Sequence, residues 1–124
     1  MQQRACGALG ELEYGGVDVE VLVVADCPNE SGAVTLVRQA LDDVGLKRVP
    51  IRTRVVASEQ DAEELGFVGS PTIRINGADP FESRGRATGL ACRVYVEHGV
   101  RSGLPDPRKL RQALKRHADV DRTE

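Results

Sequence analysis

The chain has 124 residues, of which 40% are hydrophobic and 29% charged, and its formal net charge is −2. A chain of this size and balance is typical of one globular domain that is stable without a metal ion or a disulfide framework. The sequence has no basic cluster that would suggest nucleic-acid binding and no apolar run long enough to span a bilayer, so we expect no nucleic-acid or membrane partner. The N-terminus lacks the basic and apolar segments of a secretory signal, so we expect a cytoplasmic protein.

The first predicted elements are a buried strand and a helix. Residues 1–16 are rich in glycine and lack periodicity, which indicates a flexible N-terminal arm. Residues 17–25 begin with alternation and end as a continuous apolar run, a pattern typical of a strand covered on both faces. A helical stripe of apolar residues follows Cys27; Pro28 suits its first turn, and Gly45 suits the position just past its end. We therefore expect a helix of about four turns directly after Cys27.

Local signals divide the rest of the chain into strands and helices. Ser58, with Asp61 three residues later, resembles a capping box, and Asp106-Pro107 is typical of a helix start. Asn76-Gly77 favours a tight hairpin turn. The remaining predicted elements are a strand at 50–57, a short helix at 58–65, a strand at 69–75, a strand at 92–97, a helix from residue 107 to about residue 117, and a polar tail at 119–124.

The order of these elements is β-α-β-α-β-β-α. A right-handed crossover would place the first two strands in parallel, and the last two strands would form a hairpin. We therefore predict an α/β domain over residues 17–118, with a four-stranded mixed sheet and helices on both faces.

Cys6, Cys27 and Cys92 are the only cysteines, and their odd number and unequal spacing match neither a disulfide framework nor a zinc site. His98 and His117 stand too far apart in the pattern to suggest a metal site, so no metal is expected. Cys27 is the strongest candidate for a reactive thiol, because it comes directly before a predicted helix whose unpaired N–H groups and dipole favour a thiolate.

Two carboxylates and a second thiol accompany Cys27. Asp26 and Glu30 oppose the thiolate by charge repulsion, so we expect partial activation. Glu30 lies one helical turn from Cys27, where it serves either as a general base or as an acid that suits the first turn of a helix. If the last two strands pair antiparallel, Cys92 lies about 15 Å from Cys27, too far for a disulfide. The long connection at 78–89 leaves the alternative open, because it is long enough to return Cys92 to the site.

Two segments resemble the thioredoxin and glutaredoxin superfamily, and the resemblance extends from residue 17 to about residue 117. They are Asp26-Cys27-Pro28-Asn29, at the junction of the first strand and helix, and Gly69-Ser70-Pro71-Thr72, which is similar to the family's G-[ST]-P-T segment with its cis proline. The resemblance implies a thioredoxin-like fold in which Pro71 is cis and faces Cys27. It also implies that Ser70, Pro71 and Thr72 align a peptide or glutathione.

The resemblance is to single-cysteine members of that superfamily. The family's dithiol motif is C-x-x-C, but Glu30 occupies the fourth position here, so a local disulfide cannot form. Monothiol members act through mixed disulfides, often with glutathione. The chain also resembles small bacterial thioredoxin-like proteins with a D-C-P-N start and a G-x-D-P-F segment, here Gly77 to Phe81, some of which carry names borrowed from alkylmercury lyase.

Three functions follow from these candidates. The leading hypothesis is a thioredoxin-like thiol oxidoreductase with Cys27 as nucleophile, protein thiols or glutathione as partners, and no bound cofactor. The second is a protein that binds soft metals or organomercurials through Cys27 and Cys92, since soft ions prefer thiolates. The third is a non-catalytic interaction module, which an unperturbed, buried Cys27 would favour. The pattern leaves open whether the protein is an enzyme and whether it forms oligomers.

Other residues are weaker candidates. Cys6 lies on the predicted arm. Arg74, Arg84 and Arg86 would suit an anion, but scattered arginines are more typical of a solvated face. The segment Asp79-Pro80-Phe81 predicts a turn that carries an apolar plug.

Overall fold

The computed structural model describes residues 17–81 and 87–123, and the side chains of residues 17–81 and 87–118. The predicted arm at 1–16 with Cys6, and also Arg84 and Arg86, lie outside these ranges. The elements are β1 (Val19–Val23), α2 (Glu30–Asp43), β2 (Ile51–Val55), α3 (Glu59–Leu65), β3 (Thr72–Ile75), β4 (Tyr95–Glu97), β5 (Val100–Ser102) and α4 (Pro107–Thr123).

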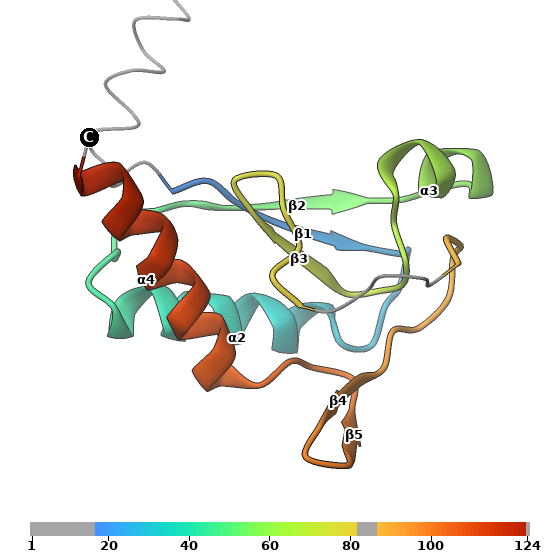
Figure 1. Ribbon diagram of the computed structural model, residues 1–124. Coiled ribbons are helices and arrows are strands. Elements are labelled where there is room, and N and C mark those ends of the chain that lie inside the picture. The colour runs from blue at the N-terminus through green and yellow to red at the C-terminus, as the bar shows by residue number, and fades with distance from the viewer. Residues whose placement is uncertain (1–16, 82–86, 124) are drawn as a thin grey trace, which may run out of the picture.

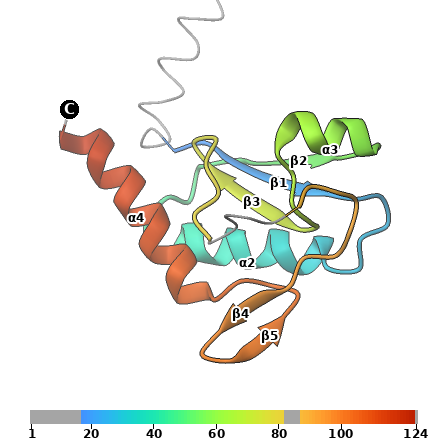
Figure 2. The same ribbon diagram turned by 45° about the vertical axis from the view of Figure 1, so that its right-hand side comes forward.

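A three-stranded sheet lies between two layers of helices (Figure 1 and Figure 2). β1 is its central strand, with β2 parallel on one side and β3 antiparallel on the other. Helices α2 and α4 cover one face of the sheet, and the short helix α3 lies on the other. The predicted class, an α/β domain with helices on both faces of a mixed sheet, is therefore confirmed.

The two faces of β1 build two separate cores. Val19, Val21 and Val23 are fully buried on the face that α2 and α4 cover. Leu22 points to the opposite face, where it packs with Val56, Ala62 and Phe67. A strand that is covered on both faces reads as a continuous apolar run, which is the pattern at this place in the sequence. The helices complete the larger core with Ala33, Val37, Ala40 and Leu41 of α2 and Leu110, Ala113, Leu114 and Ala118 of α4.

The predicted helix signals act as expected, with shifts of a few residues at the boundaries. The hydroxyl of Ser58 accepts a hydrogen bond from the N–H of Asp61 at 3.1 Å and so caps α3. α2 starts at Glu30, a little later than predicted. α4 continues to Thr123, so the segment predicted as a polar tail at 119–124 is helical over most of its length.

The predicted fourth strand of the sheet is wrong. The sequence predicts that residues 92–97 pair antiparallel with the third strand, but of these residues only Cys92 pairs with that part of the chain, in an isolated parallel bridge with Ser70. The tight turn at Asn76-Gly77 does form, with the N–H of Ala78 donating to the carbonyl of Ile75 at 3.1 Å. The chain then leaves the sheet instead of returning along β3. The sheet of the described residues therefore has three strands, not four.

Residues 95–102 form a hairpin of their own. β4 and β5 pair antiparallel, with Glu97 opposite Val100. The turn between them consists of His98 and Gly99, which have positive φ angles of 54° and 79°. Such two-residue turns match the twist of a hairpin. The alternation at 92–97 is thus a true strand signal, but its partner is the segment that follows it, and the hairpin projects from the sheet beside the start of α4 (Figure 1).

The smaller core supplies a test of this architecture. Phe67 is fully buried between the sheet and α3, so Phe67→Ala should remove about 3–5 kcal/mol from the free energy of unfolding, as measured by urea denaturation. Val55, which is 52% exposed on β2, provides the control, and Val55→Ala should cost less than about 1 kcal/mol. Equal losses in the two variants would contradict the placement of α3 over this face.

Candidate functional site

Cys27 lies in the loop between β1 and α2. Asp26 has a left-handed backbone, with φ of 58°, and this reverses the chain after β1. The carbonyl of Cys27 accepts a hydrogen bond from the N–H of Glu30 at 3.2 Å, and α2 begins at that residue. Cys27 lies before the helix but not directly before it, because Pro28 and Asn29 lie between Cys27 and the first helical residue; the predicted start of the helix right after Cys27 is wrong by two residues. It is only 8% exposed and belongs to the larger core, so its thiol is nearly covered.

The loop formed by Ser70, Pro71 and Thr72 is fastened to the segment that leads to Cys27. The hydroxyl of Ser70 accepts a hydrogen bond from the N–H of Val24 at 3.0 Å, at the point where β1 ends. The Ser70–Pro71 peptide bond is cis, as expected from the resemblance. All three loop residues are buried. The two segments that carry the resemblance therefore meet at one end of the sheet.

Cys92 lies opposite Ser70. The N–H of Ser70 donates to the carbonyl of Ala91 at 2.8 Å, and the N–H of Arg93 donates to the carbonyl of Ser70 at 2.9 Å. The predicted distance of about 15 Å between Cys92 and Cys27 assumes that residues 92–97 pair antiparallel with β3, and they do not. Instead, the backbone hydrogen bonds of Ala91 and Arg93 to Ser70 place Cys92 at the end of the sheet where β1 finishes. Cys92 itself is exposed, and neither Cys27 nor Cys92 is in a disulfide.

A buried arginine anchors the Cys92 segment. The side chain of Arg93 is 1% exposed, and its Nη1 donates to Asp79 Oδ2 at 2.6 Å and to Thr72 Oγ1 at 3.2 Å. The guanidinium carbon lies 4.4 Å from the ring centroid of Tyr95, whose hydroxyl donates to the carbonyl of Pro71 at 2.5 Å. Two consecutive residues of the Pro71 loop are thus bound to the segment that begins at Cys92. The Nε of Arg93 is buried and has no hydrogen-bond partner among the described residues.

A glycine allows this close approach. Gly69 has a φ of 140°, which side-chain-bearing residues rarely adopt, and a Cβ at this position would lie 2.8 Å from the Cβ of Arg93. Gly89 also lies close to the backbone before the Pro71 loop, because its N–H donates to the carbonyl of Phe67 at 3.1 Å. The segment around Cys92 therefore packs directly against the backbone that leads into the Pro71 loop.

The sequence pattern does not indicate a site role for Arg93. Arginine is among the residues least often buried, so nothing in its type or spacing indicates a core position. Its partner Asp79 belongs to the segment predicted as a turn, and that turn does form, with the N–H of Phe81 donating to Asp79 Oδ1 at 2.9 Å. The proximity of Asp79 and Arg93 results from the path of the long connection, which the sequence pattern does not determine.

Glu30 and Arg74 are two further residues that the sequence suggests for the site. Glu30 is half-buried at the start of α2, and its carboxylate makes no hydrogen bond or ion pair with any described residue. Arg74 is not available for an anion in the way the sequence suggests, because its Nη2 donates to the carbonyl of Leu65 at 2.5 Å, at the end of α3. Within residues 17–81 and 87–123, no group of three or more His, Cys, Asp or Glu side chains is arranged to hold a metal ion.

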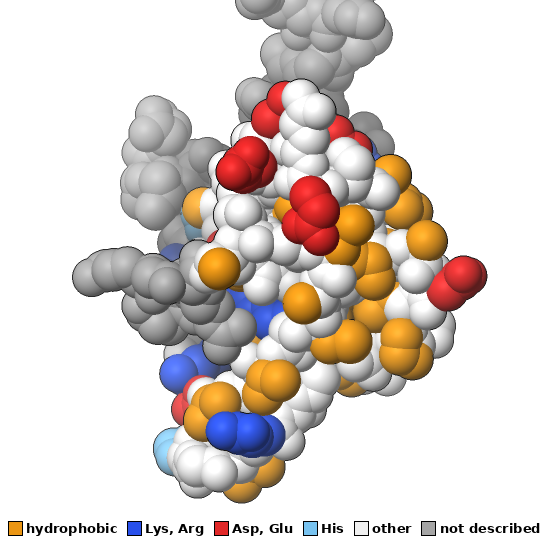
Figure 3. Space-filling view, turned by 90° about the vertical axis from the view of Figure 1, so that its right-hand side faces the viewer, with side chains coloured by type: hydrophobic (Ala, Val, Ile, Leu, Met, Phe, Trp, Pro, Cys, Tyr) orange, Lys and Arg blue, Asp and Glu red, His pale blue; other side chains and the backbone are white. Residues whose placement is uncertain are grey.

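The end of the molecule that holds these loops presents an apolar surface (Figure 3). Hydrophobic side chains gather over the middle of this face, with acidic groups above them and basic groups below. Exposed residues of the two loops that meet here include Ala25, Pro28, Leu90, Ala91 and Cys92. The surroundings of the Cys27 loop therefore suit a partner with apolar as well as polar groups.

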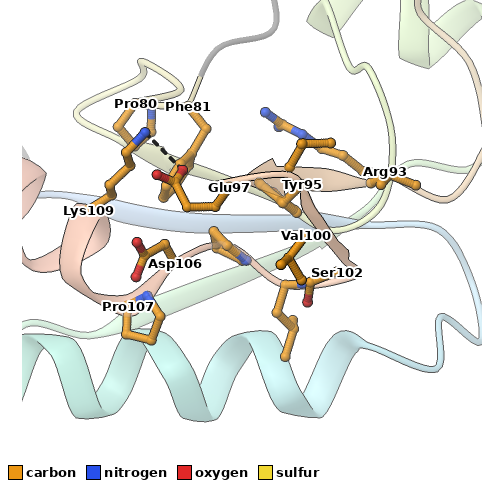
Figure 4. A pocket seen from close by; sticks show the side chains of 14 residues that line it. Pro80, Phe81, Arg93, Tyr95, Glu97, Val100, Ser102, Asp106, Pro107 and Lys109 are labelled. Atoms are coloured by element: carbon orange, nitrogen blue, oxygen red, sulfur yellow. Dashed lines mark hydrogen bonds and ion pairs between the residues drawn. The ribbon is translucent and has the colours of Figure 1, made fainter.

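A separate cavity of about 530 Å³ lies between the β4–β5 hairpin, the start of α4 and the Pro80-Phe81 turn (Figure 4). Its lining is polar and apolar in similar parts, and an ion pair between Lys109 and Glu97 at 2.9 Å bounds it. Phe81 meets the ring of Tyr95 edge to face with centroids 5.5 Å apart, so the predicted apolar plug forms one wall. None of the residues predicted to form the active site lines this cavity.

The pairing of Arg93 with Asp79 leads to a stability prediction. Asp79→Ala would leave a buried guanidinium without its counter-charge, so we expect a loss of about 3–5 kcal/mol in the free energy of unfolding, measured by chemical denaturation. Asp18 provides the matched control, since its ion pair with Arg52 at 2.7 Å is exposed, and Asp18→Ala should cost about 1 kcal/mol or less. A loss of similar size in both variants would contradict the proposed anchoring role of Arg93.

Comparison with protein-family models, with curated proteins and with solved structures found no match to this chain. In the part of the chain that the structure describes, none of the helices combines the length and the apolar character needed to cross a membrane. The candidate site therefore rests on the geometry of the loops around Cys27, Ser70 and Cys92.

Proposed function

We propose that this chain is a thiol oxidoreductase of thioredoxin-like architecture, in which Cys27 forms mixed disulfides with small thiol compounds such as glutathione. One observation carries the proposal: the loop that holds Cys27 and the loop that holds Pro71 are joined at the end of β1 by the hydrogen bond from Val24 to Ser70. A thiol before a helix and a backbone loop beside it would assist thiol–disulfide exchange, the first as nucleophile and the second as a surface that aligns its target.

The helix start suits the chemistry of the nucleophile. Disulfide exchange begins when a thiolate attacks one sulfur of a disulfide and expels the other sulfur as a thiolate. The first turn of a helix has backbone N–H groups without partners in the helix, and the positive end of the helix dipole favours a negative charge close to it, as on a sulfur that attacks from the segment before α2. Asp26 is exposed, so solvent screens its repulsion of that charge.

The burial of Cys27 sets a condition on its partners. With only 8% of the residue exposed, Cys27 has little surface for a partner to contact, which favours a small or extended disulfide over a folded protein surface. Glutathione meets this condition because it is a short, flexible tripeptide. The apolar rim that surrounds the loops provides contact area for an incoming molecule. The same burial favours the rival hypothesis of a non-catalytic module, which makes the opposite prediction because it requires an inert thiol.

The test isolates Cys27. In the double variant Cys6→Ser, Cys92→Ser, oxidised glutathione should add one glutathionyl group to the native protein at Cys27, because no second thiol is present to displace it. Intact mass and peptide mapping measure the adduct. In the matched variant Cys6→Ser, Cys27→Ser, the exposed Cys92 should react more slowly, since it lacks a helix start beside it.

Two results separate the hypotheses. Faster reaction at Cys27 than at Cys92 in the folded proteins supports the oxidoreductase. If Cys27 forms an adduct only after denaturation, the proposal is wrong and the domain is an interaction module with an inert thiol.

A further inference from the structure

We propose that Cys92 is the second redox-active thiol of this site, and that it resolves the mixed disulfide on Cys27 by forming a Cys27–Cys92 disulfide. This inference rests on the proposed function of Cys27. The motif Cys27-Pro28-Asn29-Glu30 has no second cysteine to act as the resolving thiol, and the inference assigns this role to Cys92. The reaction then uses two thiols that are far apart in sequence instead of two in one helical turn.

Cys92 lies next to the Pro71 loop. It forms a parallel bridge with Ser70, and residues paired in this way lie about 5 Å apart with their side chains on the same face. The side chain of Ser70 is directed towards the end of β1, because its hydroxyl binds the N–H of Val24. Cys92 therefore lies next to the residue that is hydrogen-bonded to the segment leading to Cys27.

The Cys92 segment is held in place by hydrogen bonds on both sides of the cysteine. Both backbone hydrogen-bonding groups of Ser70 are occupied by the neighbours of Cys92, at 2.8 and 2.9 Å. The next residue, Arg93, is buried and bound to Asp79, to Thr72 and to the ring of Tyr95. A thiol on such a segment loses little conformational entropy when it bonds to a neighbour, so its effective concentration is high.

The two thiols differ in exposure. Cys27 is nearly covered, whereas Cys92 is exposed. A thiol that is already part of the site competes with external glutathione through its higher effective concentration. Resolution from within the molecule is therefore the route that this arrangement favours.

The proposed reaction balances as two successive exchanges. The thiolate of Cys27 attacks oxidised glutathione, which forms the mixed disulfide and releases one glutathione thiolate. The thiolate of Cys92 then attacks the sulfur of Cys27, which breaks the mixed disulfide, forms the Cys27–Cys92 bond and releases the second glutathione. The protein loses two electrons and two protons, and one oxidised glutathione becomes two reduced molecules.

The experiment uses the full chain with Cys6→Ser, so that Cys27 and Cys92 are the only thiols. After treatment with oxidised glutathione and an acid quench, the intact mass should fall by two hydrogens, and peptide mapping should find the Cys27–Cys92 link. Adding Cys92→Ser should convert the product to a stable glutathione adduct on Cys27.

The outcomes distinguish the two proposals. If the Cys6→Ser protein accumulates the same Cys27 adduct as the variant that also lacks Cys92, the resolving role is wrong while the monothiol function stands. If neither protein reacts in the native state, the proposed function itself fails. A linked product that is found between two chains instead of within one would also overturn the inference, and size-exclusion chromatography separates that case.

A second measurement tests the anchoring by Arg93. Arg93→Lys keeps a positive charge near Asp79 but removes the planar group that binds Thr72 and stacks on Tyr95. In buffers of reduced and oxidised glutathione, we expect this variant to lower the effective concentration of the thiol pair roughly tenfold. Glutathione addition at Cys27, measured without Cys92, should change far less. A folded variant with an unchanged effective concentration would show that Arg93 does not position Cys92.

Discussion

Three hydrogen bonds of Ser70 organise the end of the sheet that holds the site. Its hydroxyl binds the end of β1, and its N–H and carbonyl bind the two neighbours of Cys92. Because Ser70 is fully buried, the loss of any of these bonds would leave a polar group without a partner and without water. The positions of both thiol-bearing segments, the loop of Cys27 and the segment of Cys92, depend on this one residue.

The buried guanidinium of Arg93 adds a second constraint. A charge in the interior is costly unless it is paired, and Asp79 and the ring of Tyr95 supply the compensation. Asp79 lies at the beginning of the long connection and Arg93 lies just beyond its end, so their ion pair brings the two ends of the connection together. The connection is thereby held in the path that returns Cys92 to the sheet. The absence of a side chain at Gly69 leaves the room that this path needs.

These constraints also explain why the sheet has three strands over the described residues. If residues 92–97 ran antiparallel to β3 in a continuous hairpin, Cys92 would lie near the end of β3 at Ile75, away from Pro71. The observed chain approaches Ser70 in parallel and then forms the β4–β5 hairpin with its own partner strand. As a result, the sheet has no strand beyond β3 among the described residues, and Cys92 lies beside the Pro71 loop. It also creates the cavity between that hairpin and α4, which is separate from the thiol site.

The sequence by itself determined the features that depend on neighbouring residues. The apolar run of β1, the stripe of α2, the cap at Ser58 and the turn at Asn76-Gly77 are all read correctly, because periodicity and capping act within a few residues. The place of Cys27 before a helix follows from the same local signals. Only the tertiary structure decided where Cys92 lies and that Arg93 is buried, since both depend on the path of a long connection and on contacts between residues distant in sequence. A strand pattern shows that a segment is extended, but it does not name the strand with which that segment pairs.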